Sequence, residues 1–257
     1  DNDIIDINST FQNGTVIGGS GSDTVELTAA NVAGTTFSGI EATQFVTSAG
    51  GRTIDAVQIA NLGAISLSGI SASTTTLTGL TGSTADFSNL TVADGQEFRV
   101  NNFLSTGTDL TVDFTGSVFV GSGFIDYDGF SGNETIIGGS GNDEISASSG
   151  DDSIEGGLGN DTLDGSSGNN IVRGDAGEDR LMVSTTSTGI LDGGADNDVI
   201  DINSTFQNGV VIGGSGVDTI ELTAANVSGT TFAGIEATQL VSSTGTRTID
   251  AVQVGNL

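Results

Sequence analysis

Acidic residues recur in this chain at a fixed place within a nine-residue repeat. From Gly129, six units follow one another in phase: GFSGNETII, GGSGNDEIS, ASSGDDSIE, GGLGNDTLD, GSSGNNIVR and GDAGEDRLM. Their sixth places hold Glu134, Asp143, Asp152, Asp161, Asn170 and Asp179. Carboxylates and the carbonyls of glycine-rich turns supply oxygen ligands, which hard divalent cations prefer. The spacing therefore indicates a row of cation-binding turns.

The composition removes most other kinds of chemistry. The 257 residues include 33 acidic and 5 basic residues, all five of them arginine, and the net charge is −28. Such a charge disfavours a nucleic-acid partner. His and Cys are absent, so zinc, copper and iron lack their usual ligands, and the common catalytic bases and nucleophiles are missing. We expect no enzyme activity. We also expect no membrane insertion, because no apolar run reaches 18 residues.

The spacing of the apolar residues predicts which secondary-structure elements position these turns. Only the eighth place of the unit is aliphatic in all six copies, as Ile136, Ile145, Ile154, Leu163, Val172 and Leu181. One such residue per nine cannot form a helix face or a sandwich strand pair. It can line a narrow solenoid in which each unit gives one turn and one short strand. The pattern predicts an all-β fold.

If two units form one coil, alternate turns stack on opposite edges. One edge carries Glu134, Asp152 and Asn170, and we call it the decaying edge because the motif is lost after Asn170. The regular edge carries Asp143, Asp161 and Asp179, and it continues to Asp198 and Asp218 through motifs that start at Gly193 and Gly213. Acids stacked about 4.8 Å apart repel one another unless a cation lies between them.

A longer repeat encloses the short one. Residues 1–62 recur as residues 196–257 with no gap and with 50 of 62 positions identical, which gives a unit of 195 residues. We expect a longer, tandemly repeated parent protein in which the coil closing one unit stacks directly on the coil opening the next. Asp3 and Asp23 are then equivalent to Asp198 and Asp218.

Residues 27–128 lack the nonapeptide but show a short apolar strand about every ten residues. We interpret them as further coils of 19 to 20 residues with Phe in the core. A separate β-sandwich is the alternative.

The motifs GGSGND, GGLGND and GGSGSD, each followed within two residues by an aliphatic one, resemble the GGxGxDxUx nonapeptide of RTX proteins. The resemblance covers residues 129–182 and also 18–26, 193–201 and 213–221. It implies a right-handed parallel β-roll that binds several Ca²⁺ ions, type I secretion, and folding outside the cell when calcium is met.

In this family, turn carbonyls of two successive coils join two sixth-place Asp side chains around one ion. Applied here, the resemblance predicts ions between Asp143 and Asp161, Asp161 and Asp179, Asp179 and Asp198, and Asp198 and Asp218, with an equivalent ion between Asp3 and Asp23. The alternative is that these residues merely cap turns, and on the decaying edge that alternative stays open. The residues assigned to metal sites are Asp3, Gly18, Gly19, Gly21, Asp23, Gly138, Gly139, Ser140, Gly141, Asp143, Asp152, Gly156, Gly157, Leu158, Gly159, Asp161, Gly174, Ala176, Gly177, Asp179, Gly193, Gly194, Asp198, Gly213, Gly214, Gly216 and Asp218.

These observations predict four sections: 1–26 ending one calcium roll, 27–128 of solenoid coils without the motif, 129–221 forming the next roll, and 222–257 opening the next solenoid section. The function favoured is that of a calcium-dependent extracellular structural protein, forming a rod, fibre, surface layer or adhesin stalk. The alternatives are the secretion and stability module of a larger RTX enzyme and a ligand-binding adhesin segment. Expected partners are Ca²⁺ and further copies of the unit. Sequons at Asn8, Asn133 and Asn203 leave glycans open.

Overall fold

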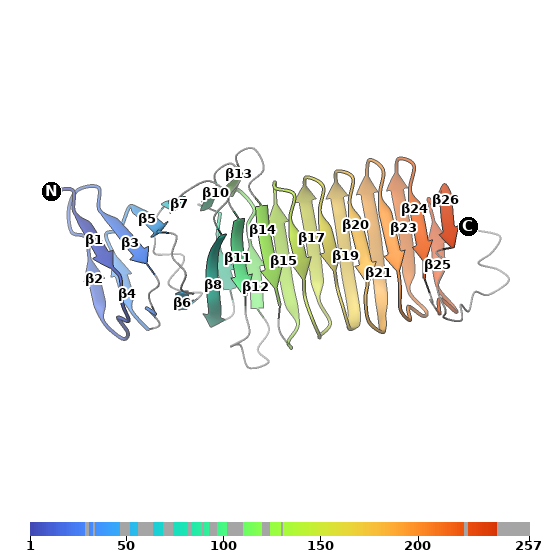
Figure 1. Cartoon of the computed structure of the whole chain (residues 1–257), viewed down its shortest axis with the longest axis horizontal. Helices are drawn as coiled ribbons and strands as arrows, with labels where there is room; N and C mark the ends of the chain where they lie inside the picture. The colour runs from blue at the N-terminus through green and yellow to red at the C-terminus, as the bar shows by residue number, and fades with distance from the viewer. Residues whose placement is uncertain are drawn as a thin grey trace.

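The computed structural model is an elongated solenoid whose described residues run from residue 1 at one end of its long axis to residue 240 near the other (Figure 1). It describes residues 1–28, 31–32, 34–46, 52–55, 64–68, 74–81, 84–88, 90–92, 97–101, 110–119, 124–129, 131–223 and 226–240. Within these residues the regular structure is entirely strand, and neighbouring strands of each sheet run parallel. The predicted all-β parallel solenoid is confirmed.

The strands form three long sheets and a short one. The six-stranded sheet contains β1 (Ile4–Ile7), β3 (Thr24–Thr28), β5 (Ala42–Val46), β7 (Ala64–Ser68), β10 (Leu90–Val92) and β13 (Val118–Phe119). The short sheet pairs β2 (Thr15–Ile17) with β4 (Thr36–Ser38). The ten-stranded sheet contains β6 (Arg52–Asp55), β8 (Thr74–Thr81), β11 (Glu97–Asn101), β14 (Phe124–Asp128), β16 (Glu144–Ser146), β18 (Thr162–Asp164), β20 (Arg180–Val183), β22 (Val199–Ile202), β24 (Thr219–Leu222) and β26 (Ala237–Leu240). The eight-stranded sheet contains β9 (Thr84–Asp86), β12 (Leu110–Asp113), β15 (Glu134–Gly139), β17 (Ser153–Leu158), β19 (Gly168–Ala176), β21 (Ser187–Ala195), β23 (Val210–Ser215) and β25 (Thr231–Ala233).

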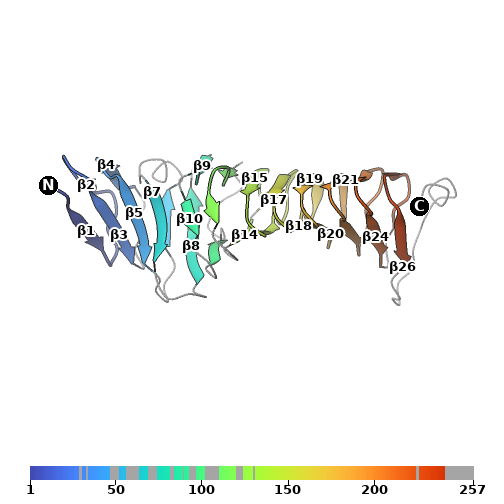
Figure 2. The ribbon, with the colours of Figure 1, turned by 90° about the horizontal axis from the view of Figure 1, so that it is seen from above.

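From β14 onward each coil has two strands, one in each of the two longest sheets. Figure 2 shows β15, β17, β19 and β21 on one side of the roll and β18, β20, β24 and β26 on the other. Ile145 pairs with Leu163 and Leu163 with Leu181, so the eighth-place residues of one sheet stack in register. They are at most 1% exposed, because these aliphatic side chains are the narrow core that the nonapeptide predicted.

The coils from β7 to β15 have three strands and a wider core. Phe87, Phe98 and Phe114 are fully buried and pack together, with the rings of Phe87 and Phe114 stacked at 4.8 Å. The Phe-rich core was predicted, and the parallel pairing excludes the sandwich alternative. The predicted coil length of 19 to 20 residues is wrong here. Arg99 and Asp126 are partners 27 residues apart, because each of these coils includes an additional strand of the six-stranded sheet.

The roll passes through the boundary between the two 195-residue units without interruption. Arg180 pairs with Val199 and Val199 with Thr219 in one sheet, while Ile190 pairs with Val210 in the other. The expected direct stacking of successive units is thus seen at residue 195. Residues 241–257, the rest of the predicted final section, lie outside the described residues.

Candidate metal centre

Each turn of the regular edge connects a strand of the eight-stranded sheet to the next strand of the ten-stranded sheet. The sixth-place residue ends the turn, so Asp143, Asp161 and Asp179 directly precede β16, β18 and β20. The second and fourth places need backbone that favours glycine: Gly157 has φ 108° and Gly159 has φ 121°. Successive coils are in register, so these turns stack into one row.

One oxygen of each sixth-place carboxylate is used in a ladder between coils. Asp161 Oδ1 accepts the Asp143 N–H at 2.8 Å, and Asp179 Oδ1 accepts the Asp161 N–H at 2.8 Å. Asp198 and Asp218 continue the ladder at 2.9 Å each. In the first copy, Asp23 Oδ1 accepts the Asp3 N–H at 2.8 Å. Each acidic side chain therefore connects its own coil to the preceding coil through a hydrogen bond.

The other oxygen of each carboxylate is buried and has no hydrogen-bond partner. This holds for Oδ2 of Asp23, Asp143, Asp161, Asp179, Asp198 and Asp218. These side chains belong to residues no more than 2% exposed. A buried polar atom without a partner is costly and rare in folded proteins. Six such atoms at equivalent places, five of them in one row and the sixth in the first copy, indicate a missing partner of one kind.

Each of these oxygens faces the first-place glycine of its own turn. A methyl group built on Gly138 would lie 2.7 Å from Asp143 Oδ2 and 2.5 Å from the carbonyl oxygen of Gly156 in the next coil. The same pair of oxygens surrounds Gly156, Gly174 and Gly193. A carboxylate oxygen and a carbonyl oxygen from adjacent coils therefore converge beside the glycine, and any side chain there would displace them.

Burial without a countercharge raises the pKa of these carboxyl groups. Desolvation is the main cause, and it raises the pKa of Asp161 to about 8 and those of Asp143 and Asp198 to about 7. The pKa of Asp179 rises to about 6 for the same reason. Neighbouring carboxylates add to the rise at Asp161 and Asp198, while the ladder hydrogen bonds oppose it. The turns thus hold negative charge at a considerable cost unless a cation is bound.

The donor set fits calcium. Among the described residues no three acidic side chains gather at one point, so a cation must take most of its ligands from main-chain carbonyls. Ca²⁺ accepts such mixed sets of six to eight oxygens in flexible geometry. The residues that would hold it are the sixth-place Asp and the glycine-rich turn that precedes it, and a bound ion would supply the positive charge that the stacked carboxylates lack.

The structure places the predicted residues in two rows. Asp143, Asp161, Asp179, Asp198 and Asp218 lie together with their glycines along the regular edge, and Asp3 and Asp23 lie in the first copy with Gly18, Gly19 and Gly21. The third-place Leu158 is 59% exposed, so only its main chain faces the turn. Asp152 stands apart on the decaying edge. Whether these residues bind metal is a prediction that stays open to experiment.

Two features of the rows were not foreseen. The regular edge ends in Glu236, whose Oε2 accepts the Asp218 N–H at 2.9 Å, and Glu41 does the same for Asp23 at 2.8 Å. The spacing of 18 residues, which is one coil, was the available signal. Asn residues at the fifth place form a second ladder: Asn142 Oδ1 accepts the Asn160 N–H at 3.0 Å. That ladder connects each turn to the following one.

The decaying edge retains the ladder but only part of the cradle, meaning the carboxylate and carbonyl oxygens that converge beside a first-place glycine. Glu134 Oε2 and the Ala147 carbonyl oxygen still converge beside Gly129, and Asp152 Oδ2 is buried without a hydrogen-bond partner. Glu134 N–H donates to Asp152 Oδ1 at 2.8 Å, and Asp152 N–H donates to Asn170 Oδ1 at 2.9 Å. The Asn170 amide then donates to the Gly165 carbonyl at 2.7 Å, where an acid would leave an oxygen pair. The first place before Asp152 is Ala147, which is fully buried. On this edge the Ala147 methyl group therefore replaces a first-place glycine, and the Asn170 amide replaces the second carboxylate oxygen of a sixth-place acid. The regular edge repeats both the glycine and the carboxylate oxygen.

Comparison with known families agrees with this geometry. Residues 128–163 and 155–183 match the model of the RTX calcium-binding nonapeptide repeat, which comprises 4 copies. No curated protein and no solved structure matches the chain. None of the described residues belongs to a helix long and apolar enough to cross a bilayer.

Proposed function

We propose that this β-solenoid, whose residues 128–163 and 155–183 match the RTX calcium-binding nonapeptide repeat, is a calcium-dependent, extracellular structural protein that forms a stiff rod. The observation that carries this proposal is the row of buried carboxylate oxygens without partners along an unbroken roll. Calcium between the coils would make the fold, and therefore the rod, conditional on the ion.

The magnitude is sufficient for such a role. Extracellular calcium modules bind at about 10⁻⁴ to 10⁻³ M, and at ten times the dissociation constant one site contributes roughly 1.4 kcal/mol. The five predicted ions would together contribute about 7 kcal/mol, which rivals the ~5 to 15 kcal/mol that stabilises a typical domain. Sites of this affinity fill outside the cell and stay largely empty in the cytosol.

A catalytic role is not part of the proposal. The sixth-place carboxylates are buried and each gives one oxygen to the ladder, so a substrate would have to displace a turn to reach them. On the ten-stranded sheet, Arg180 pairs with Asp201 at 2.6 Å and with Glu221 at 3.1 Å.

Small-angle X-ray scattering of the chain tests the proposal. In calcium we expect the profile of an elongated rod, and in chelator that of an expanded chain. Magnesium should not replace calcium, because it resists dehydration and demands stricter octahedral geometry. A compact rod in chelator would remove calcium from the explanation. The alternative of an enzyme's secretion module is decided by the parent sequence: further 195-residue units support the rod, and an adjoining catalytic domain contradicts it.

A further inference from the structure

Two turns of the regular edge carry an aspartate where the other turns carry glycine. Asp175 occupies the second place of its turn with φ 71°, and Asp196 occupies the fourth place of the next turn with φ 76°. A side chain in this left-handed region costs free energy, because its Cβ crowds the backbone. On the decaying edge the same region is occupied by Ser148 and Ser166. The backbone alone therefore does not require an acidic residue at these places.

The neighbouring coils hold the main chain of both aspartates in place. Asp175 is the register partner of Gly157 in the preceding coil and of Gly194 in the following one. A methyl group built on Gly194 would collide with the Asp175 carbonyl oxygen, and one built on Gly216 would collide with the Asp196 carbonyl oxygen. The two main chains thus pack closely against the following turns, while both aspartates remain exposed.

The charges of these aspartates act on the predicted ion site between Asp179 and Asp198. Desolvation is the main cause that raises the pKa of Asp179 to about 6, and the negative charges of Asp175 and Asp196 raise it further. In addition to desolvation, Asp196 contributes to the raised pKa of Asp198. No neighbouring charge contributes to the raised pKa of Asp143. Negative charge is therefore concentrated in the middle of the row and not at its start.

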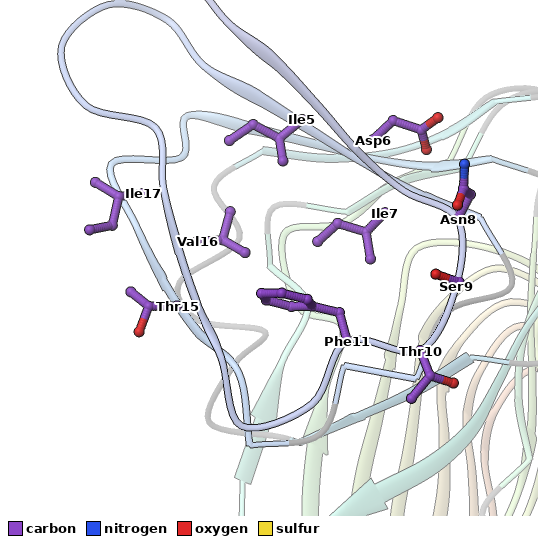
Figure 3. A pocket seen from close by; sticks show the side chains of 10 residues that line it. All are labelled: Ile5, Asp6, Ile7, Asn8, Ser9, Thr10, Phe11, Thr15, Val16 and Ile17. Carbon is purple, nitrogen blue, oxygen red and sulfur yellow. The ribbon is translucent and has the colours of Figure 1, made fainter.

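No arginine among the described residues forms an ion pair with Asp175 or Asp196. Arg180, by contrast, pairs with two carboxylates on the ten-stranded sheet. The hollow between β1 and β2 in Figure 3 has no such concentration of charge, because Asp6 is the one acidic residue among those that line it and its carboxylate points away from the ring of Phe11. The two aspartates thus add charge beside buried carboxylate oxygens that have no hydrogen-bond partner.

We propose that these two aspartates make the calcium site between Asp179 and Asp198 the tightest of the row, so that it fills first and starts the ordering of the roll. The inference rests on the proposed calcium-dependent function and ranks the sites of that row. The buried oxygens of Asp179 and Asp198 hold the ion together with turn carbonyls, and the exposed aspartates attract it through their charge. Calcium affinity rises with the acidic charge of a site, and each added charge should raise it roughly threefold to tenfold.

Asparagine substitutions separate the charge from the backbone. Asn tolerates the left-handed region as Asp does, so Asp175→Asn and Asp196→Asn remove the charges and retain the turns. In titration calorimetry of the whole chain, each substitution should weaken the tightest calcium step roughly threefold to tenfold, with the number of ions unchanged. The control is Asp151→Asn, on an exposed turn of the decaying edge. It should change that step less than about twofold in 0.1 M salt, which screens charges beyond roughly 10 Å.

Circular dichroism supplies a second readout, because the site that fills first sets the calcium concentration at which the β signal appears. That concentration should rise in Asp175→Asn and Asp196→Asn and stay near the parent value in Asp151→Asn. A tightest step that is unchanged in both variants, or weakened equally in the control, would overturn the inference and leave the aspartates as residues that tolerate the turn. A parent chain that binds no calcium contradicts the proposed function itself, so the two failures are distinguishable.

Discussion

Replacing Asp161 by Asn should reverse the sign of its effect on stability between calcium and chelator. Asn keeps Oδ1, which accepts the Asp143 N–H at 2.8 Å, and it replaces Oδ2 by a donor. Asn170 shows the result, because its amide donates to the Gly165 carbonyl at 2.7 Å. The new amide at position 161 can donate to the Gly156 carbonyl in the same way and close the cradle without a cation.

The two magnitudes oppose each other. With calcium, the substitution removes the two ions predicted beside Asp161, which costs about 3 kcal/mol at ten times the dissociation constant. Without calcium, burial raises the pKa of Asp161 from 3.8 to about 8. Its contribution to folding is then present at low pH and is lost as pH rises to 8, by on the order of 5 kcal/mol. Asn removes that loss, so the variant should be less stable than the parent in calcium and more stable in chelator.

Urea unfolding followed by circular dichroism at pH 8 measures both arms, with the osmolyte TMAO added in chelator to bring the apo chain into a measurable range. Titration calorimetry counts the ions. Asp151→Asn is the matched control, since it removes one charge from an exposed fifth-place residue and retains the oxygen that accepts the Asn169 N–H. A loss of stability of equal size in calcium and chelator, or an unchanged ion count, would refute the reasoning.

Two further predictions follow from the same rows. In chelator, acidification from pH 8 to 5 should increase the β signal, because the raised pKa values of Asp143, Asp161, Asp179 and Asp198 mean that the fold takes up protons; a β signal that falls over this range would contradict them. Ala147→Gly combined with Asn170→Asp should add one calcium ion on the decaying edge, since it restores both the glycine cradle and the second carboxylate. Calorimetry would show the gain, and the fifth-place change Asn169→Asp should not produce it.

The nonapeptide was a sufficient guide to the roll. Its phase placed Ile145, Leu163 and Leu181 in one stack and Asp143, Asp161 and Asp179 in another, and both stacks are present. The prediction succeeds because the strands pair in parallel and in register, so residues separated by one coil length along the chain become neighbours on adjacent strands. The growth of the coil to 19 and then 20 residues was also readable, since each longer coil still ends in a sixth-place Asp.

The number of strands per coil could not be predicted in the same way. β10 and β13 have three and two residues, and segments so short have no period that distinguishes a third side from a turn. Glu41 and Glu236 were missed for a different reason. They occupy the sixth place without the preceding glycine pair, and their longer side chains still reach the N–H that an Asp would bind.

The change from three sides to two coincides with the start of the predicted calcium row, and it predicts which part of the chain unfolds first without calcium. The six-stranded sheet ends at β13, and the first turn of the regular edge takes its place: Ser140 Oγ lies 3.5 Å from the Ser117 carbonyl, and Asp143 Oδ1 accepts the Ile125 N–H at 2.9 Å. A strand is thereby replaced by a turn in which one buried carboxylate oxygen, Asp143 Oδ2, has no hydrogen-bond partner. The three-sided coils retain their own apolar core, whereas each strand from β15 to β19 buries one aliphatic side chain. Hydrogen exchange in chelator should therefore release the amides of β16 and β18 before those of β11 and β12. Equal rates in the two sections, or earlier release in the three-sided coils, would show that the ions stabilise the solenoid as a whole.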